Sequence, residues 1–451
     1  MEEERERDMG KKFTFIGAGS LGFTTALARD ILSFDAFKDC DISLMDIHEG
    51  RLEYSRKAIQ KIVDAGKYPA KVSATTDRKK ALEGADGVLI TILQGGVDVW
   101  RHDIEIPKTY GVDINCGDTR GPSGVIRFLR TAPVMLDIIR DVEAICPKAV
   151  VLNYTNPMAM LCGYLQRMSK VNVTGLCHSV QGTADMLARW IGAKPSEITY
   201  TCAGVNHTSF FLEYNWNGED AYPLIFDKVR NDPAVANEEQ VRNEMFLNLG
   251  LYPTESSGHN SEYLPWFRKR PELIEKYCTH GTGWNPGIYA AILDGYLQAA
   301  ETWEARFIEF LENEETNLER GGEYASNIFN GLFGDGDPYV FNGNQLNNGI
   351  ISNMQPLACV ETPVLASPTG LQPIHVGKLP DNIATLVDHM ARIEEMAINA
   401  VIECDPWLVF QANLFDPLTS SVLSMAEIME MTQKLLDKNE AFLGYFKSLK
   451  I

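Results

Sequence analysis

The sequence of 451 residues predicts an α/β fold in two parts: a doubly wound parallel sheet with covering helices, then an α+β domain. Three observations lead to this prediction. Short apolar runs alternate with amphipathic segments over residues 11–176, as in successive βαβ units. A glycine-rich turn, GAGSLG, joins the first apolar run to the first helix. After about residue 176 this alternation gives way to an aromatic, β-rich pattern, so we place the second domain over 177–451.

The first domain is expected to begin after a charged segment. Residues 1–10, MEEERERDMG, lack apolar periodicity and are predicted to be a disordered extension. Strands are predicted at KKFTFI, ISLMDI, DGVLITIL and AVVLNYTNP. Helices are predicted near TTALARDIL, over 51–65 and over 124–146, where apolar residues recur at three and four positions. The result is a Rossmann-like domain.

The second domain is expected to mix strands and helices. TYTCAGVNHTSFFLEYNW has the aromatic and β-branched content of strands, and helical segments follow it. Residues 334–348 are rich in glycine and asparagine, so we predict an irregular connection there. Two helical stretches are predicted to close the chain.

The bulk composition narrows the class of protein. The formal net charge of -20 argues against binding to nucleic acid or anionic membranes, which require clustered Lys and Arg. The nine cysteines are scattered, form no CxxC pair and follow no apolar signal segment, as expected for reduced thiols in a cytoplasm. No run approaches the roughly 18 apolar residues of a membrane-spanning helix. We therefore expect a soluble cytoplasmic protein.

The glycine-rich turn predicts a dinucleotide site. Gly17 permits the tight turn, Gly19 lets the backbone approach a pyrophosphate, and Gly22 lets helix and strand pack closely. Asp46 closes the second strand 24 residues beyond Gly22, where a carboxylate accepts both ribose hydroxyls and repels a 2′-phosphate. This context favours NAD over NADP. The alternative is that the glycines serve a turn alone and Asp46 caps the next helix.

A second group of residues could hold a metal ion. Cys177 and His178 stand where one strand ends, and His207 ends or interrupts another strand 30 residues after Cys177. A thiolate and an imidazole at strand ends could share one ion, leaving positions for substrate hydroxyls. A buried cysteine and a hydrogen-bonded core histidine are the commoner explanation of such a pair.

Polar residues near the same sheet edge are candidate substrate contacts. Asn153 and Asn156, in NYTNP, follow a sheet strand, where doubly wound folds bind ligands. Their amides could hold a sugar hydroxyl or the nicotinamide, or could serve turn chemistry before Pro157. Asp118, in GDTRGPSG, carries a carboxylate before the long helix, where a helix-start role accounts for it equally well.

Seven segments taken in order resemble glycoside hydrolase family 4: FTFIGAGS, LMDI, GDTRGPSG, LNYTNPMAM, GLCHSVQGTA, AGVNH and TESSGHNSEYLPWF. CHSV is similar to the α-galactosidase (melibiase) branch. The resemblance implies a fold like that of lactate and malate dehydrogenases, NAD, Mn²⁺, and homodimers or homotetramers. It makes Cys177 and His207 metal ligands, His178 the acid for the leaving group, and Asn156 and Asp118 substrate contacts. A thiolate by itself favours zinc or iron, so manganese comes from the resemblance.

The resemblance also implies a redox-neutral hydrolysis of an α-galactoside. NAD⁺ removes hydride from sugar C3, a base takes the C2 proton, the aglycone leaves, water adds, and hydride returns to C3. The TESSGHNSEY segment offers Glu255, His259, Glu262 and Tyr263 as the base. We favour Tyr263, whose pKa a nearby metal ion could lower; an aromatic packed beside Trp266 is the alternative.

Other activities remain open at this point. Within the same family, α-galacturonide or α-glucoside could be the substrate, because the sequence does not reveal which group the sugar carries at C6. A hydroxy-acid dehydrogenase would share the first domain, but no glycine-flanked HGD or HGE histidine is present. A noncatalytic NAD or sugar sensor would need an output module, and no basic helix-turn-helix is seen.

Overall fold

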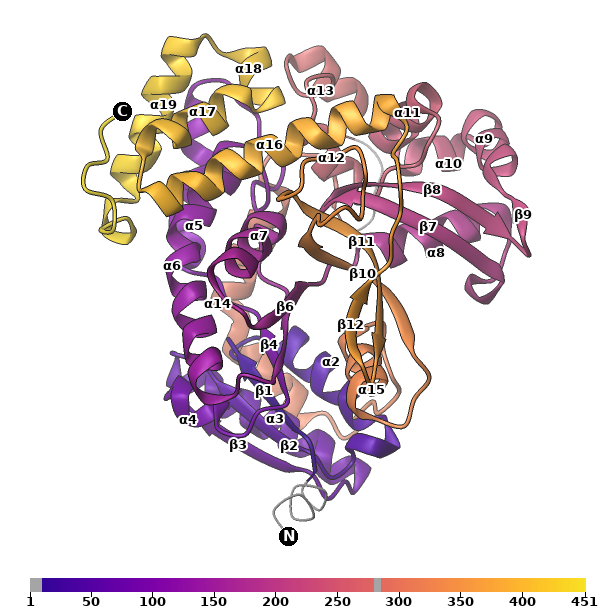
Figure 1. Cartoon of the computed structure of the whole chain (residues 1–451), viewed down its shortest axis with the longest axis vertical. Helices are drawn as coiled ribbons and strands as arrows, with labels where there is room; N and C mark the ends of the chain where they lie inside the picture. Colours follow the sequence, from indigo (N-terminus) through magenta and orange to yellow (C-terminus); the bar gives the residue numbers. More distant parts are fainter. Residues whose placement is uncertain (1–9, 280–284) are drawn as a thin grey trace.

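The computed structural model describes residues 10–279 and 285–451, and it builds them around one mixed β-sheet (Figure 1). Within the described residues the strand order is β3-β2-β1-β4-β5-β6-β10-β11-β7-β8-β9, with β12 paired to β11. The strands are β1 Lys12–Ile16, β2 Asp41–Met45, β3 Lys71–Thr75, β4 Gly87–Ile90, β5 Val150–Asn153, β6 Asn172–Gly175, β7 Ile198–Val205, β8 Thr208–Trp216, β9 Glu219–Asp220, β10 Tyr339–Leu346, β11 Cys359–Ser367 and β12 Gly370–Pro373.

Helices cover both faces of the sheet and form a cap beyond one end of it (Figure 1). The helices are α2 Leu21–Leu32, α3 Glu49–Gly66, α4 Arg78–Leu82, α5 Gly96–Thr109, α6 Gly121–Ile145, α7 Met158–Met168, α8 Ser179–Ile191, α9 Tyr222–Asn231, α10 Pro233–Glu238, α11 Gln240–Leu249, α12 Ser257–Tyr263, α13 Pro271–Tyr277, α14 Ala291–Glu312, α15 Ala325–Phe333, α16 Asp381–Glu403, α17 Pro406–Phe415, α18 Pro417–Val422 and α19 Met425–Lys438. Short 3₁₀ turns lie at Asp35–Phe37, Pro195–Glu197 and Glu440–Phe442.

The parallel half of the sheet confirms the predicted doubly wound fold. Strands β3-β2-β1-β4-β5-β6 pair in parallel, the order of dinucleotide-binding domains. Side chains of β1 alternate between two cores, with Phe13 and Phe15 in the core under α2 and α3 and Ile16 in the core under α6 and α7. Parallel strands end at one edge, so the loops after β1, β4, β5 and β6 lie together there.

The second half continues the same sheet in antiparallel fashion. β10 joins β6, with Asn344 opposite Gly175, and β7 and β8 form a hairpin. The predicted irregular connection over 334–348 was wrong, because it contains β10. Its polar and small residues suit a buried strand here: Asn342 Nδ2 donates to Cys202 O at 2.8 Å, and a Cβ on Gly343 would lie 2.8 Å from Thr174 Oγ1.

The predicted helices are mostly found where expected. α3 and α6 match the predictions over 51–65 and 124–146 to within three residues. The first closing stretch is α16, which crosses the top of the molecule in Figure 1 and packs on α6, α7 and α17. The second is divided into α17, α18 and α19. Pro406 and Pro417 begin α17 and α18, each capped by the preceding aspartate, and Ser424 caps α19.

The predicted boundary at 176/177 falls between β6 and α8 and stays a prediction, since one sheet runs through both parts. The predicted extension over 1–10 lies outside the described residues except for Gly10. No helix among the described residues combines the length and apolar character needed to cross a membrane.

Candidate active site

The glycine-rich turn between β1 and α2 has a backbone that suits a bound diphosphate. Gly17 has a φ of +89°, and a Cβ there would lie 2.3 Å from Thr91 O, so the turn requires glycine. A Cβ on Gly19 would lie 2.7 Å from Asp46 Oδ2. The N-cap residue Ser20 makes no side-chain capping bond to α2, so the first N–H groups of the helix remain available for an anion.

The structure contradicts one detail of the predicted dinucleotide site and one detail of its alternative. Gly22 is exposed and a Cβ there would meet nothing within 4 Å, so its predicted role in close helix–strand packing was wrong. Asp46 does not cap α3, since His48 is the N-cap and accepts from Arg51 N at 3.1 Å. The Asp46 carboxylate accepts instead from Gly19 N at 2.7 Å and His48 N at 2.8 Å, which holds it over the turn.

The folded chain gathers Cys177, His207 and Glu255. Cys177 follows β6, His207 lies in the turn between β7 and β8, and Glu255 precedes α12. Their ligand atoms lie within 4.8 Å of one another. Glu255 Oε2 is 3.4 Å from His207 Nε2 and 3.8 Å from Cys177 Sγ. Thiolate, imidazole and carboxylate are donors that a divalent ion accepts, so the three residues fit a metal ion.

The second nitrogen of His207 faces two hydroxyls. Nδ1 is 3.2 Å from Thr119 Oγ1 and 3.2 Å from Tyr263 OH. Burial lowers the pKa of His207 to about 4, although the carboxylate of Glu255 acts to raise it. The imidazole is therefore neutral at pH 7. Burial raises the pKa of Tyr263 well above 10, and Asp118 adds to the effect. As a base, Tyr263 therefore depends on a cation to lower that pKa.

Next to this cluster lies a second one of similar composition, formed by Cys116, Asp118 and His259. Asp118 accepts from Asn156 Nδ2 at 2.9 Å, and its Oδ1 lies 3.6 Å from His259 Nε2. Burial alone would raise the pKa of Asp118, but the hydrogen bond and charge of His259 outweigh it and hold that pKa well below the usual range. Burial opposes the charge on His259, yet Glu255 and Asp118 raise its pKa to about 9.

His178 stands apart from both clusters. Its Nε2 lies 2.9 Å from both carboxylate oxygens of Glu323, and its ring packs near Phe23, Tyr154 and Tyr324. Burial lowers the pKa of His178, but Glu323 outweighs it, so the net shift is upward. Half of the side chain is exposed. The role of His178 as a proton donor stays a prediction.

The two asparagines of NYTNP differ. Asn153 is fully buried and bonds within the turn, donating from Nδ2 to Thr155 O at 3.0 Å and accepting from Thr155 N at 2.9 Å. Its substrate contact stays a prediction. Asn156 points at Asp118, and its buried Oδ1 has no hydrogen-bond partner within the described part of the chain. Asn156 is therefore the better placed of the two to meet a ligand.

The two arginines near Asp118 also differ. Arg120 forms an ion pair with Glu394 at 2.7 Å and donates to Asn206 O at 2.6 Å. Arg127 is buried over the ring of Trp100, at 4.7 Å, and donates to Asn156 O at 3.3 Å. Within the described residues its Nη1 is buried without a hydrogen-bond partner.

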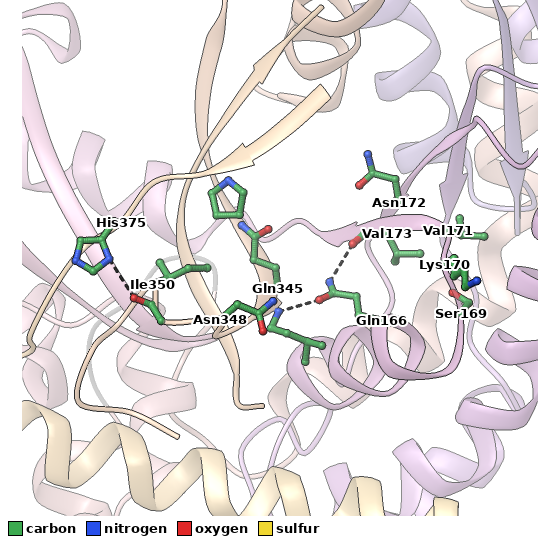
Figure 2. Close-up of a pocket in the computed structure, with 13 residues that line it drawn as sticks. Gln166, Ser169, Lys170, Val171, Asn172, Val173, Gln345, Asn348, Ile350 and His375 are labelled. Atoms are coloured by element: carbon green, nitrogen blue, oxygen red, sulfur yellow. Dashed lines mark hydrogen bonds between the residues drawn. The ribbon is translucent and has the colours of Figure 1, made fainter. Parts of the chain in front are cut away.

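A cavity of about 660 Å³ lies at the opposite end of β6 from Cys177. Gln166, Asn172, Gln345 and His375 are among its lining residues (Figure 2). Gln166 is occupied by the fold itself, because it donates to Val173 O and Asn344 O and accepts from Leu346 N. None of the predicted site residues lines this cavity.

Comparison with known proteins decides the family. The model of the family 4 glycosyl hydrolases matches residues 12–193, and that of the family 4 C-terminal domain matches residues 202–419. The chain belongs to the family 4 glycosyl hydrolases. Family 4 relatives include an α-galactosidase of Rhizobium meliloti, 35% identical over 94% of this chain and 87% of its own, and one of Bacillus subtilis, 35% identical over 97% and 100%.

Solved structures confirm the predicted fold. LplD from Bacillus subtilis superposes with a TM-score of 0.84 at 26% identity, covering 95% of this chain and 100% of its own. A 6-phospho-α-glucosidase from gut microorganisms, solved with NAD and Mn²⁺, gives 0.80 at 19% identity, covering 96% and 99%. Cryptosporidium parvum malate dehydrogenase gives 0.51 at 17% identity, covering 88% and 100%, so the predicted dehydrogenase-like architecture is found in this family 4 chain.

Sequence reasoning missed several residues of the site. Thr119 and Glu323 were not singled out, and Glu255 was considered as a base and not beside Cys177 and His207. Thr119 and His207 are 88 residues apart and His178 and Glu323 are 145 apart, so no local pattern joins them. The one available signal was the concentration of polar and ionisable residues in TESSGHNSEY.

Proposed function

We propose that the protein hydrolyses α-galactosides with the help of bound NAD and a divalent metal ion, Mn²⁺. The observation that carries this proposal is the Cys177–His207–Glu255 cluster, which lies beside Asp118 at the edge of the sheet that also holds the glycine-rich turn. The α-galactosidase relatives, aligned over nearly the whole chain, support the choice of sugar.

The cofactor would lie along the turn formed by Gly17, Gly19 and Gly22, with Asp46 at the ribose. Asp46 is already held over the turn by Gly19 N, and the open N-terminus of α2 supports a diphosphate there. When bound, NAD⁺ supplies the hydride acceptor for sugar C3, and the metal withdraws electron density from the sugar oxygens.

The remaining roles are assigned to side chains around the clusters. Cys177 and His207 would hold the metal, and Asn156, Asp118 and Asn153 would contact the sugar. Asn156 Oδ1 supports this, because a sugar hydroxyl would satisfy a buried acceptor.

Proton transfer would fall to two residues. His178 would protonate the departing oxygen, since Glu323 favours its charged form. Tyr263 would take the C2 proton: its OH lies 3.2 Å from His207 Nδ1, so a cation on that imidazole would favour the phenolate.

A second candidate substrate is an α-galacturonide. Arg127 supports it, because its buried Nη1 has no hydrogen-bond partner among the described residues and could bind a carboxylate at C6. α-Galacturonidases also occur among the more distant relatives, for example one of Thermoanaerobacterium saccharolyticum at 29% identity.

We further propose a cytoplasmic homodimer or homotetramer that acts on small glycosides. The nine free cysteines support a reducing compartment. Size-exclusion chromatography with light scattering would measure the assembly.

The activity test uses reduced protein with NAD⁺, Mn²⁺ and p-nitrophenyl α-galactoside, α-glucoside or α-galacturonide. Nitrophenol release and absorbance at 340 nm are followed together, with and without cofactor and chelator. We expect release that needs both additions and no net NADH. Release that ignores both additions in cofactor-stripped protein contradicts the proposal, and stoichiometric NADH without cleavage indicates a dehydrogenase.

A further inference from the structure

Glu255 carries a buried carboxylate with unusual neighbours. Its side chain is 4% exposed, and its Oε1 lies 3.4 Å from His259 Nδ1. Its Oε2 lies 3.4 Å from His207 Nε2 and 3.8 Å from the sulfur of Cys177. Across residues 10–279 and 285–451, the long hydrogen bond from the Cys177 thiol is the one that this carboxylate accepts. Oε1 therefore faces a cation, while Oε2 faces two potential metal ligands.

Other buried carboxylates nearby are satisfied by N–H and O–H donors. Glu262 accepts from the backbone N–H groups of Asn115, Cys116 and Gly117 at 2.7–3.0 Å. Glu361 accepts from Ser209 Oγ at 2.8 Å and Asn206 Nδ2 at 3.2 Å. Leaving a buried polar group without such donors is unfavourable, so Glu255 Oε2 differs from its neighbours in needing another positive partner.

The hydrogen bonds of Thr119 favour one tautomer of His207. The Thr119 hydroxyl donates to Asp118 Oδ1 at 2.9 Å, so toward His207 its oxygen is an acceptor. In the tautomer that suits Thr119, Nδ1 of His207 carries the proton and Nε2 presents a lone pair. That lone pair faces the carboxylate oxygen of Glu255, and two acceptors at 3.4 Å repel each other unless a cation lies between them.

The separations themselves match those between the ligands of one ion. Metal–ligand bonds of about 2.0–2.2 Å to nitrogen and oxygen and about 2.3 Å to sulfur put neighbouring ligand atoms roughly 3–4 Å apart. The measured 3.4 and 3.8 Å are in this range. Both Glu255 and His207 also adopt left-handed backbone conformations, with φ of 69° and 63°. Such conformations are unfavourable for these residues and are commonly retained at functional sites.

From this geometry we propose that Glu255 is a third protein ligand of the divalent metal ion, bound through Oε2 beside Cys177 and His207. The inference rests on the proposed metal-dependent function and extends it. A carboxylate is a hard ligand of the kind that Mn²⁺ prefers. A ligand set of sulfur, nitrogen and oxygen therefore suits Mn²⁺ better than the thiolate and imidazole alone. A thiolate and a carboxylate together also balance the charge of the ion.

The direct test is the crystal structure of the wild-type holoprotein with NAD and Mn²⁺, which requires no variant to fold. We expect Glu255 Oε2 in bonding contact with the ion, together with Cys177 Sγ and His207 Nε2. An ion bound to Cys177 and His207 while Glu255 stays hydrogen-bonded elsewhere overturns the inference.

A solution test compares two identical substitutions. Mn²⁺ is titrated into wild type, Glu255→Gln and Glu361→Gln, and the concentration of free Mn²⁺ is measured by electron paramagnetic resonance. Thermal unfolding verifies that each variant is folded. We expect Glu255→Gln to weaken Mn²⁺ binding by at least about 10-fold, and Glu361→Gln, which removes an equally buried carboxylate, to change it by less than about 3-fold. Equal affinity of wild type and folded Glu255→Gln overturns the inference.

The two proposals fail differently in these experiments. Wild type that binds Mn²⁺ and cleaves glycoside, with Glu255→Gln binding Mn²⁺ equally well, removes only the ligand role of Glu255. Wild type that neither binds Mn²⁺ nor needs it for cleavage removes the proposed function and the inference together.

Discussion

Two clusters of the same residue types, a cysteine, a histidine and a carboxylate, lie side by side in the site. In the first, Glu255 Oε2 lies 3.4 Å from His207 Nε2 and accepts one long hydrogen bond, at 3.8 Å, from the thiol of Cys177. In the second, Asp118 accepts conventional hydrogen bonds at 2.9 Å from Thr119 and Asn156 and pairs with charged His259. Composition alone does not separate the two clusters, but their hydrogen bonds do.

The difference has a physical cause in the protons. His207 is held neutral by burial, whereas His259 is held charged by Glu255 and Asp118. The cationic imidazole neutralises the second cluster from within. In the first cluster, neutral His207 supplies no positive charge beside the carboxylate of Glu255. A divalent cation bound there would supply it. The second cluster therefore supports the first, through Thr119 and His259, without needing an ion of its own.

The largest effect that this comparison predicts is that of Cys177→Ser. Removing the thiolate from the first cluster should weaken Mn²⁺ binding by more than about 100-fold, since even loss of a supporting contact around a metal site costs 10- to 100-fold. Isothermal titration calorimetry with Mn²⁺ measures it, and α-galactosidase activity should fall in parallel. Wild-type affinity in folded Cys177→Ser would place the metal outside the first cluster.

A second prediction concerns the charge on His259. Its folded pKa, about 9, is above the ordinary value of 6.5, so its contribution to stability is complete below about pH 6.5 and is lost as the pH rises through about 9. A shift of this size is worth up to roughly 3 kcal/mol. Urea unfolding of metal-free protein between pH 6 and 10 should show the loss.

The control for this pH effect is Asp118→Asn, which removes one of the two carboxylates that favour charged His259. In this variant the free energy of unfolding should decrease less between pH 6.5 and 9 than in wild type. A stability that stays constant from pH 6 to 10 in wild type would mean that His259 is neutral and that the second cluster is not neutralised from within.

The contrast between the clusters also shows what the sequence could predict. Gly17, Gly19 and Asp46 were predicted because their roles depend on a few neighbouring residues: a turn with a φ of +89°, a close backbone approach, and the end of the next strand. Cys177 and His207 were predicted because each stands at the end of a predicted strand and the resemblance makes both of them metal ligands, although His207 lies in the turn of the antiparallel β7–β8 hairpin. These are local or topological features, and the fold preserves them.

The rest depends on contacts that no local pattern encodes. Gly22 fits the same motif as Gly17 but has open space around it, so a motif match did not guarantee the packing. The acceptor role of Thr119 toward His207 follows from a bond across 88 residues and from where the hydroxyl proton goes. The strand β10 was missed because its asparagines are satisfied by the backbone of distant strands.

A third prediction tests the bond that joins the clusters. Thr119→Val keeps the shape of the side chain and removes the acceptor that fixes the proton on His207 Nδ1. Mn²⁺ affinity should fall about 10- to 100-fold, as for other residues that orient a ligand. Thr119→Ser should restore it, because serine offers the same hydroxyl. Equal affinity in the valine and serine variants would show that Tyr263 OH suffices to orient His207.

The smallest effect is expected for Cys116→Ser, the counterpart of Cys177→Ser in the second cluster. Cys116 is buried, its thiol is held protonated because burial and Asp118 raise its pKa, and serine keeps a donor toward that carboxylate. Mn²⁺ affinity should stay within about 2-fold of wild type, and the loss of stability should be about 1 kcal/mol, typical of one altered hydrogen bond. Calorimetric titration and urea unfolding measure the two quantities on the same sample. Loss of Mn²⁺ binding in folded Cys116→Ser would contradict this assignment. The ion would then bind to the second cluster, although hydrogen bonds already satisfy the polar groups of that cluster.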